Sequence, residues 1–165
     1  MTTDLIGHAP MLLCLGLLAG AALSDLTSYT IPNRLVAGIV ALYPFHLALG
    51  AGAPSWGAPV AALAVLAAGF GLFAWGKMGA GDVKLAAAAV LWIGAADTAA
   101  FLVVTALAGG ALSVLFAGPY RFPLARVALS VGVSRLHDGL IARDLPYGVA
   151  IAAGAFAALA PRLPG

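Results

Sequence analysis

Long apolar runs, separated by short polar intervals, are the feature that most restricts how this chain can fold. A membrane-spanning helix needs about 20 mostly apolar residues. Six runs approach that length, at about 5–23, 35–50, 59–75, 83–96, 99–117 and 147–159. Only 8% of the 165 residues are charged, whereas soluble domains contain about 25%. The sequence therefore predicts an all-α, polytopic membrane protein with six transmembrane helices in a single domain over residues 1–165.

Two segments leave alternatives open. The run at 83–96 is short for a full crossing at about 1.5 Å per residue. Its helix either starts within the preceding polar stretch or is tilted, with local thinning of the bilayer. The segment 118–146 mixes arginine and aspartate with leucine and valine. It is either in part an amphipathic helix on the membrane surface or a solvated cytoplasmic loop.

The distribution of lysine and arginine predicts the orientation in the membrane, because cytoplasmic loops carry an excess of both. Seven of the eight basic residues fall in the first, third and fifth predicted loops: Arg34, Lys77, Lys84, Arg121, Arg126, Arg135 and Arg143. Only Arg162 lies on the other side. We therefore expect these three loops to be cytoplasmic and both termini to lie outside.

Two acidic residues, Asp25 and Asp82, stand where apolar runs meet polar intervals. A carboxylate at the edge of a bilayer is costly unless it has a partner or a function. Two predicted crossings separate the two residues, so both belong to the cytoplasmic side. If the first and fourth helices pack together, the two carboxyl groups can share one proton. Such a pair can activate water to attack a peptide carbonyl.

The helix dipole predicts a division of labour within this pair. Asp82 starts a helix near Lys77 and Lys84, so it should favour its charged form. Asp25 ends a helix, so it should favour its neutral form. We therefore expect Asp82 to be the base and Asp25 the acid of the free enzyme.

Residues beside the acids have both a functional and a structural interpretation. Gly79 and Gly81 allow positive φ and a close backbone approach next to Asp82, or they form only a flexible turn. Pro32 and Asn33 start the second helix, proline because it needs no N–H donor there and asparagine as a cap. Alternatively, they contact the substrate.

The other candidate site residues follow the same logic. Lys84 either pairs with Asp82 or with an acidic residue of the substrate, or it serves only to fix the topology. Pro146, Tyr147 and Gly148 are expected to set the last helix against the helices that carry the acids.

The remaining polar residues exclude other kinds of site. His8, His46 and His137 are scattered without the spacing of metal ligands, and the single Cys14 can form neither an internal disulfide nor a CxxC zinc pair. The chain has no basic stripe outside its loops, so nucleic-acid binding is not expected.

Three further acids are set aside as members of the pair. Asp138 and Asp144 lie among arginines, which is typical of surface salt bridges. Asp97 belongs to the opposite side of the membrane.

Three motifs occur in order along the chain: Asp25 followed by Ile31-Pro32-Asn33, then Gly79-Ala80-Gly81-Asp82-Val83-Lys84, then Leu145-Pro146-Tyr147-Gly148. This order resembles the type IV prepilin peptidases, which are intramembrane aspartic proteases with a GxGD motif. The resemblance implies that Asp25 and Asp82 are the catalytic pair. It also implies cleavage of a short basic leader from prepilins or pseudopilins at the cytoplasmic face of a bacterial inner membrane, without a metal or organic cofactor.

The chain is similar to the short peptidases of tight-adherence (Flp) pilus systems, and also to archaeal preflagellin peptidases. Larger members carry a cytoplasmic insert with paired CxxC motifs and also N-methylate the new N-terminus. This sequence has one cysteine and no such insert, so we expect it to lack methyltransferase activity.

Three other functions are alternatives for a chain with acids at the membrane edge. A small transporter would use the acids as proton or cation sites, but such sites usually lie near the midplane on broken helices. A non-catalytic subunit would bind prepilins without cleaving them. A GxGD protease of another kind would place its acids within the bilayer.

Overall fold

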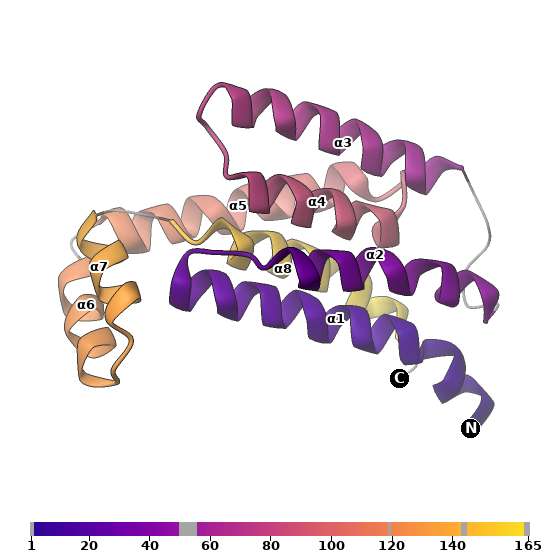
Figure 1. The fold of residues 1–165 in the computed structure, drawn as a ribbon, viewed down its shortest axis with the longest axis horizontal. Helices are drawn as coiled ribbons and strands as arrows, with labels where there is room; N and C mark the ends of the chain where they lie inside the picture. Colours follow the sequence, from indigo (N-terminus) through magenta and orange to yellow (C-terminus); the bar gives the residue numbers. More distant parts are fainter. Residues whose placement is uncertain (1, 50–55, 119, 143–144, 164–165) are drawn as a thin grey trace.

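The computed structural model describes residues 2–49, 56–118, 120–142 and 145–163, and these residues are helical apart from short connections (Figure 1). The helices are α1 (Thr2–Ser28), α2 (Asn33–Ala48), α3 (Gly57–Ala74), α4 (Ala80–Ile93), α5 (Thr98–Ala117), α6 (Arg121–Ser130), α7 (Ser134–Ala142) and α8 (Tyr147–Leu159), followed by the 3-10 turn η1 (Ala160–Arg162). The predicted all-α class is confirmed.

The six apolar runs correspond to α1, α2, α3, α4, α5 and α8, but the lengths of these helices differ. Three segments are long and apolar enough to cross a membrane: Gly7–Ser28, Gly57–Ala74 and Thr98–Phe116. The shorter α8 continues into η1 as an apolar segment, Tyr147–Arg162. α2 has 16 residues and α4 has 14, which gives lengths of about 24 and 21 Å. The structure therefore supports a membrane protein with several spans, while the count of six crossings stays a prediction.

The short helix α4 lies at the centre of the bundle. It packs against α3, α8 and α2, while α1 packs against α2 and α8, and α5 packs against α8. Leu85, Ala89 and Val90 of α4 have no exposed surface. The indole N–H of Trp92 donates to the carbonyl oxygen of Ile39 at 2.9 Å, which ties α4 to α2 without leaving a buried donor unpaired. The centre of the bundle thus positions the start of α4, where Asp82 lies.

The described residues of the segment 118–146 include two short helices, α6 and α7. α6 and α7 make a hairpin with a turn at Gly132, whose φ is +80°. Four buried side chains, Phe116, Ala125, Ala128 and Leu140, form a small core of their own. Figure 1 shows this hairpin at one end of the bundle, whereas the start of α1 and η1 lie at the other end. Its location on the membrane surface stays a prediction.

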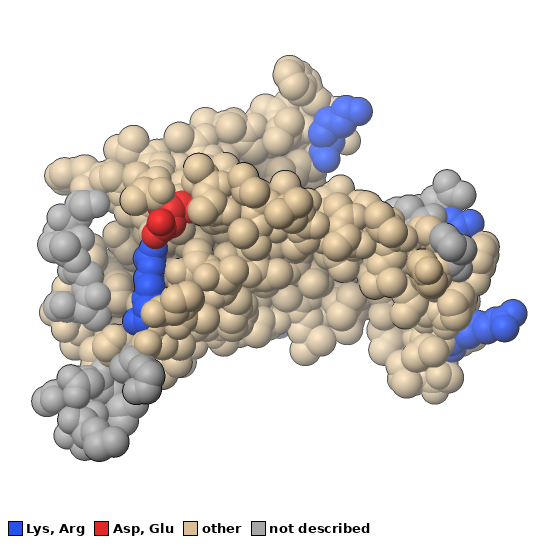
Figure 2. All heavy atoms as spheres, turned by 180° about the vertical axis from the view of Figure 1, so that it is seen from behind, with Lys and Arg blue, Asp and Glu red and all other residues tan. Residues whose placement is uncertain are grey.

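Charged side chains gather at the ends of the bundle. On the face shown in Figure 2, a broad surface without charged groups separates them. At the end of α4, Arg162 donates to the carbonyl oxygens of Trp92 and Ile93 and pairs with Asp97. Asp97 stands at the N-cap position of α5, but its carboxylate serves this ion pair and makes no capping hydrogen bond. The arrangement places Asp97 at the opposite end of α4 from Asp82.

Close packing of α5 and α8 depends on one small residue. A Cβ at Gly154 would lie within 3.2 Å of the carbonyl oxygen of Phe101 and would collide with the hydroxyl of Thr105. We predict that Gly154→Leu lowers the free energy of unfolding in detergent by about 1–3 kcal/mol, the usual cost of overpacking. Gly110→Leu on α5 is the matched control, because nothing lies within 4 Å of that position. Equal melting temperatures for the two variants would contradict this packing.

Candidate active site

Asp25 lies inside the last turn of α1. The helix was expected to stop near Leu23, but it continues to Ser28, and the amide of Tyr29 still donates to the carbonyl oxygen of Asp25 at 2.8 Å. Tyr29 then adopts a left-handed conformation, with φ +53°, which ends the helix. The side chain of Asp25 is only 6% exposed, so it is directed into the bundle.

The carboxylate of Asp25 caps a different helix. Its Oδ2 accepts a hydrogen bond of 2.7 Å from the backbone N–H of Gly148, in the first turn of α8. The N-cap residue of α8 is Pro146, which has no side-chain acceptor. The first N–H groups of a helix need an acceptor and carry a partial positive charge. Asp25 supplies this acceptor across 123 residues of sequence. Asp25 therefore lies at the C-terminal end of α1, as expected, and also meets the N-terminal end of α8.

Gly148 is required by this contact. A Cβ at this position would lie 2.9 Å from Oδ2 of Asp25, 3.0 Å from its Cβ and 3.0 Å from Cδ1 of Ile31. Any larger residue would push the start of α8 away from Asp25. The predicted positioning role of the third motif is thus exerted by Gly148 directly on one acid.

Pro146 and Tyr147 contribute to the start of α8 without lining the acid cavity. Pro146 is buried at the N-cap. The ring of Tyr147 packs toward Gly109 of α5, where a Cβ would lie 3.4 Å from it. These two residues position α8.

Asp82 lies in the first turn of α4, three residues after the N-cap Gly79. The backbone N–H of Gly79 hydrogen-bonds to the Asp82 carboxylate, which is the reciprocal half of a capping box. α4 begins at Ala80, which agrees with the first of the two alternatives, that this helix starts within the polar stretch.

The two glycines before Asp82 provide room rather than positive φ. Gly79 has φ −73°, and neither Gly79 nor Gly81 has positive φ, so that part of the expectation is wrong. A Cβ at Gly79 would lie 2.8 Å from Oδ2 of Asp82. A Cβ at Gly81 would lie 3.3 Å from Cβ of Ile31. The expected close backbone approach is confirmed.

One cavity of about 380 Å³ brings the acids together. It is lined by Asp25, Tyr29, Thr30, Ile31, Asn33, Gly79, Ala80, Gly81, Asp82 and Lys84. Six of the ten predicted site residues are therefore gathered in one place, namely Asp25, Asn33, Gly79, Gly81, Asp82 and Lys84. Gly148 contacts Asp25 directly, whereas Pro32, Pro146 and Tyr147 are outside the lining.

Lys84 and Asn33 form a polar contact at the rim of this cavity. The ammonium of Lys84 donates to Oδ1 of Asn33 at 3.2 Å. Pro32 is the N-cap residue of α2 and Asn33 is its first helical residue, so Asn33 does not cap this helix as expected. The side chain of Asn33 instead links the start of α2 to α4.

Tyr29, Thr30 and Ile31 also line the cavity, although they were not among the predicted site residues. Ile31 lies between the starts of α4 and α8, close to both Gly81 and Gly148. Tyr29 extends toward α7, because a Cβ at Gly139 would collide with its ring. Their position in the sequence, between Asp25 and the Pro32-Asn33 pair, could have indicated that they line the same cavity.

The environment raises the pKa of Asp82. This residue precedes the apolar part of α4 and lies outside the three segments long enough to cross a membrane. Burial, and next the negative charge of Asp25, raise the pKa of Asp82 from 3.8 to about 6, although the Gly79 N–H acts in the opposite direction. The expectation that the helix dipole and nearby lysines would favour the charged form is thus wrong, because desolvation and the second acid outweigh them.

Within the described residues, no group of three His, Cys, Asp or Glu side chains could hold a metal ion. Asp138 is exposed on α7, and Asp144 lies outside the described residues. The polar side chains that line the cavity are the two carboxyl groups, the ammonium of Lys84, the hydroxyls of Tyr29 and Thr30 and the amide of Asn33.

This raised pKa predicts how the stability of the protein depends on pH. An ionised Asp82 costs the folded state at most about 3 kcal/mol, since a pKa change of one corresponds to about 1.4 kcal/mol. The cost is absent below pH 3.8, develops as the pH rises to about 6 and is complete above it. Asp82→Asn should therefore unfold at a higher temperature than the wild type at pH 8 and at the same temperature at pH 4. Identical pH dependence for both proteins in detergent would contradict the assigned environment.

Comparison with known proteins gives one match. The model of the type IV leader peptidase family matches residues 11–114. Neither the curated proteins nor the solved structures contain a match. The matched region runs from α1 into α5 and includes both Asp25 and Asp82, while Gly148 follows it. Because the match covers more than half of the sequence, this chain belongs to the type IV leader peptidase family.

Proposed function

We propose that this protein is an aspartic endopeptidase that removes the short basic leader from prepilins or pseudopilins, with Asp25 and Asp82 as its catalytic residues. Membership of the family supports peptidase activity and the class of substrate. The observation that carries the assignment of residues is the single cavity that both acids line at one end of the bundle.

The two acids divide the chemistry according to their surroundings. In the free enzyme below about pH 6, Asp82 holds the shared proton, because burial and the charge of Asp25 raise its pKa to about 6. We assign the ionised role to Asp25, whose carboxylate accepts the N–H of Gly148 at the positive end of α8. This division is the reverse of the one expected from sequence, because burial and the second acid raise the pKa of Asp82.

Hydrolysis then needs one water molecule between the acids. Asp25 takes a proton from water, and the oxygen attacks the peptide carbonyl carbon. Asp82 donates its proton to the carbonyl oxygen, which gives a neutral tetrahedral intermediate. Asp25 next protonates the leaving amine while Asp82 recovers a proton from a hydroxyl group of the intermediate, and the carbon–nitrogen bond breaks. The pair ends with one shared proton, as it began.

Backbone N–H donors hold the two carboxyl groups in position before substrate binds. Gly148 N–H and Gly79 N–H each hold one carboxyl group in the first turn of a helix. Both helices pack against each other in the bundle. Positioning of this kind supplies much of the rate enhancement of enzymes.

The charge distribution supports a cytoplasmic active site in a bacterial inner membrane. Lys77, Lys84 and the arginines of α6 and α7 belong to the polar segments at the acid end, whereas Arg162 caps the opposite end of α4. This asymmetry follows the rule that basic loops stay inside. Both termini would then lie outside. We propose endopeptidase activity alone, since the sequence has one cysteine and no paired CxxC motif.

Neutral substitutions of the acids test the assignment. We predict that Asp25→Asn and Asp82→Asn each reduce prepilin cleavage by about 10²–10⁴-fold, the usual contribution of a catalytic acid or base. Leader removal would be followed by gel shift after co-expression with a prepilin. Asp138→Asn, which removes the same charge from the exposed surface of α7, should cleave like the wild type. Full activity of either active-site variant would refute the proposed pair, and ion flux without cleavage in vesicles would favour a transporter.

Displacing α8 should impair the same reaction. We predict that Gly148→Ala lowers kcat by about 10²-fold, because the added methyl group moves Asp25 and a shift of about 1 Å can cost this much. Gly16→Ala on α1 is the control, since nothing lies within 4 Å of a Cβ there. Unchanged kcat in a folded Gly148→Ala protein would show that the Asp25 contact does not matter for catalysis.

A further inference from the structure

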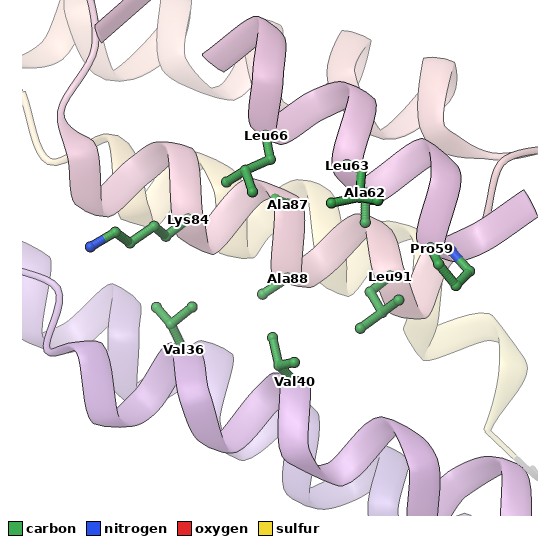
Figure 3. A pocket seen from close by; sticks show the side chains of 10 residues that line it. All are labelled: Val36, Val40, Pro59, Ala62, Leu63, Leu66, Lys84, Ala87, Ala88 and Leu91. Atoms are coloured by element: carbon green, nitrogen blue, oxygen red, sulfur yellow. The ribbon is translucent and has the colours of Figure 1, made fainter. Parts of the chain in front are cut away.

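An apolar groove runs along α4 between α2 and α3. Both helices pack against α4, but they make few contacts with each other. The space between them holds about 430 Å³ and is lined by Val36, Val40, Pro59, Ala62, Leu63, Leu66, Lys84, Ala87, Ala88 and Leu91. Figure 3 shows Val36 and Val40 of α2, and Leu63 and Leu66 of α3, directed toward α4.

The lining follows the pattern of helix packing. α4 contributes Lys84, Ala87, Ala88 and Leu91, which are spaced i, i+3, i+4 and i+7. α3 contributes Pro59, Ala62, Leu63 and Leu66 with the same spacing. Residues with this spacing lie on one face of a helix, which is the face that contacts a helical partner. The small side chains Ala87 and Ala88 at the centre would let that partner approach closely, as at helix interfaces in membranes.

The length and volume of the groove limit how much of a partner can fit into it. From position 84 to position 91, α4 rises about 10 Å, which is about two turns. A volume of about 430 Å³ is far too small for a whole helix but takes a few large apolar side chains. The occupant would therefore present one face, with anchors about three or four residues apart.

Lys84 connects this groove to the acid cavity, because it lines both. It is the only charged residue among the ten that line the groove. Its ammonium repels a basic segment, so the basic leader would lie on the far side of the acids. The segment on the other side of the cleaved bond would extend the other way, along α4, and the apolar lining of the groove requires that segment to be apolar.

We infer that this groove is the docking site for the apolar helix of the substrate, with Leu63 and Val40 as its side walls. The inference rests on the proposed peptidase function and adds where the uncleaved part of the prepilin lies. An acyl chain of a membrane lipid is the competing occupant.

Cross-linking tests the occupant independently of catalysis. Val40→Cys and Leu63→Cys would be made in an Asp82→Asn, Cys14→Ser protein, since Cys14 is the single native cysteine. Both positions are exposed in the groove, at 45% and 63%. Leu107→Cys on α5 is the control, at 70% exposure outside the groove. The probe is a full-length recombinant prepilin of the tight-adherence type, in vesicles, with single cysteines placed along its apolar helix.

We expect disulfides from both groove positions to every third or fourth residue of the prepilin helix, and none from position 107. Leu63→Trp should also raise KM for the full-length prepilin by about tenfold, the effect of losing one well-packed apolar contact. Leu107→Trp should leave KM unchanged.

The outcomes separate this inference from the proposed function. Cleavage by the wild type without cross-links in the groove would overturn the inference and leave the peptidase assignment standing. Cross-links in the groove without any cleavage would support the docking site and overturn the peptidase assignment. Equal cross-linking at all three positions, or a groove that reacts only with lipid, would overturn the inference.

Discussion

Placing two carboxyl groups inside an apolar bundle is the constraint on which this structure depends. Each group must find a hydrogen-bond donor, because an unpaired buried charge is among the most costly features a fold can contain. The starts of α8 and α4 supply these donors through the N–H groups of Gly148 and Gly79. The acids are thus held by the ends of two helices that pack on each other.

This arrangement explains why glycine occupies so many positions around the acids. Gly79, Gly81 and Gly148 all lie where a Cβ would meet Asp82, Ile31 or Asp25 at 3.3 Å or less. The backbone can therefore approach the carboxyl groups closely enough to donate. Because these glycines have no side chain, space remains around the acids as an open cavity. Lys84 lines both this cavity and the groove between α2 and α3.

Much of this site could be predicted from the sequence. The apolar runs indicated helices, and the polar intervals between them located Asp25, Asp82, the glycines and Lys84. Other features could not be predicted, because they depend on contacts between distant segments. The donor to Asp25 comes from 123 residues away, and local dipoles gave the wrong direction for the pKa of Asp82 because they ignore burial and the second acid. The α6–α7 hairpin was also ambiguous, since its hydrophobic residues form a small core that only the folded contacts define.

The claim that the acids act as a pair is tested most directly by titrating Asp82 itself. Infrared spectra of protein labelled with ¹³C-aspartate, with Asp82→Asn as the subtracted reference, report the protonated carboxyl group in vesicles. The account predicts a pKa of about 6 in the wild type and a lower pKa in Asp25→Asn, where the neighbouring charge is gone. A pKa near the ordinary 3.8 that does not respond to Asp25→Asn would show that the two carboxyl groups do not interact.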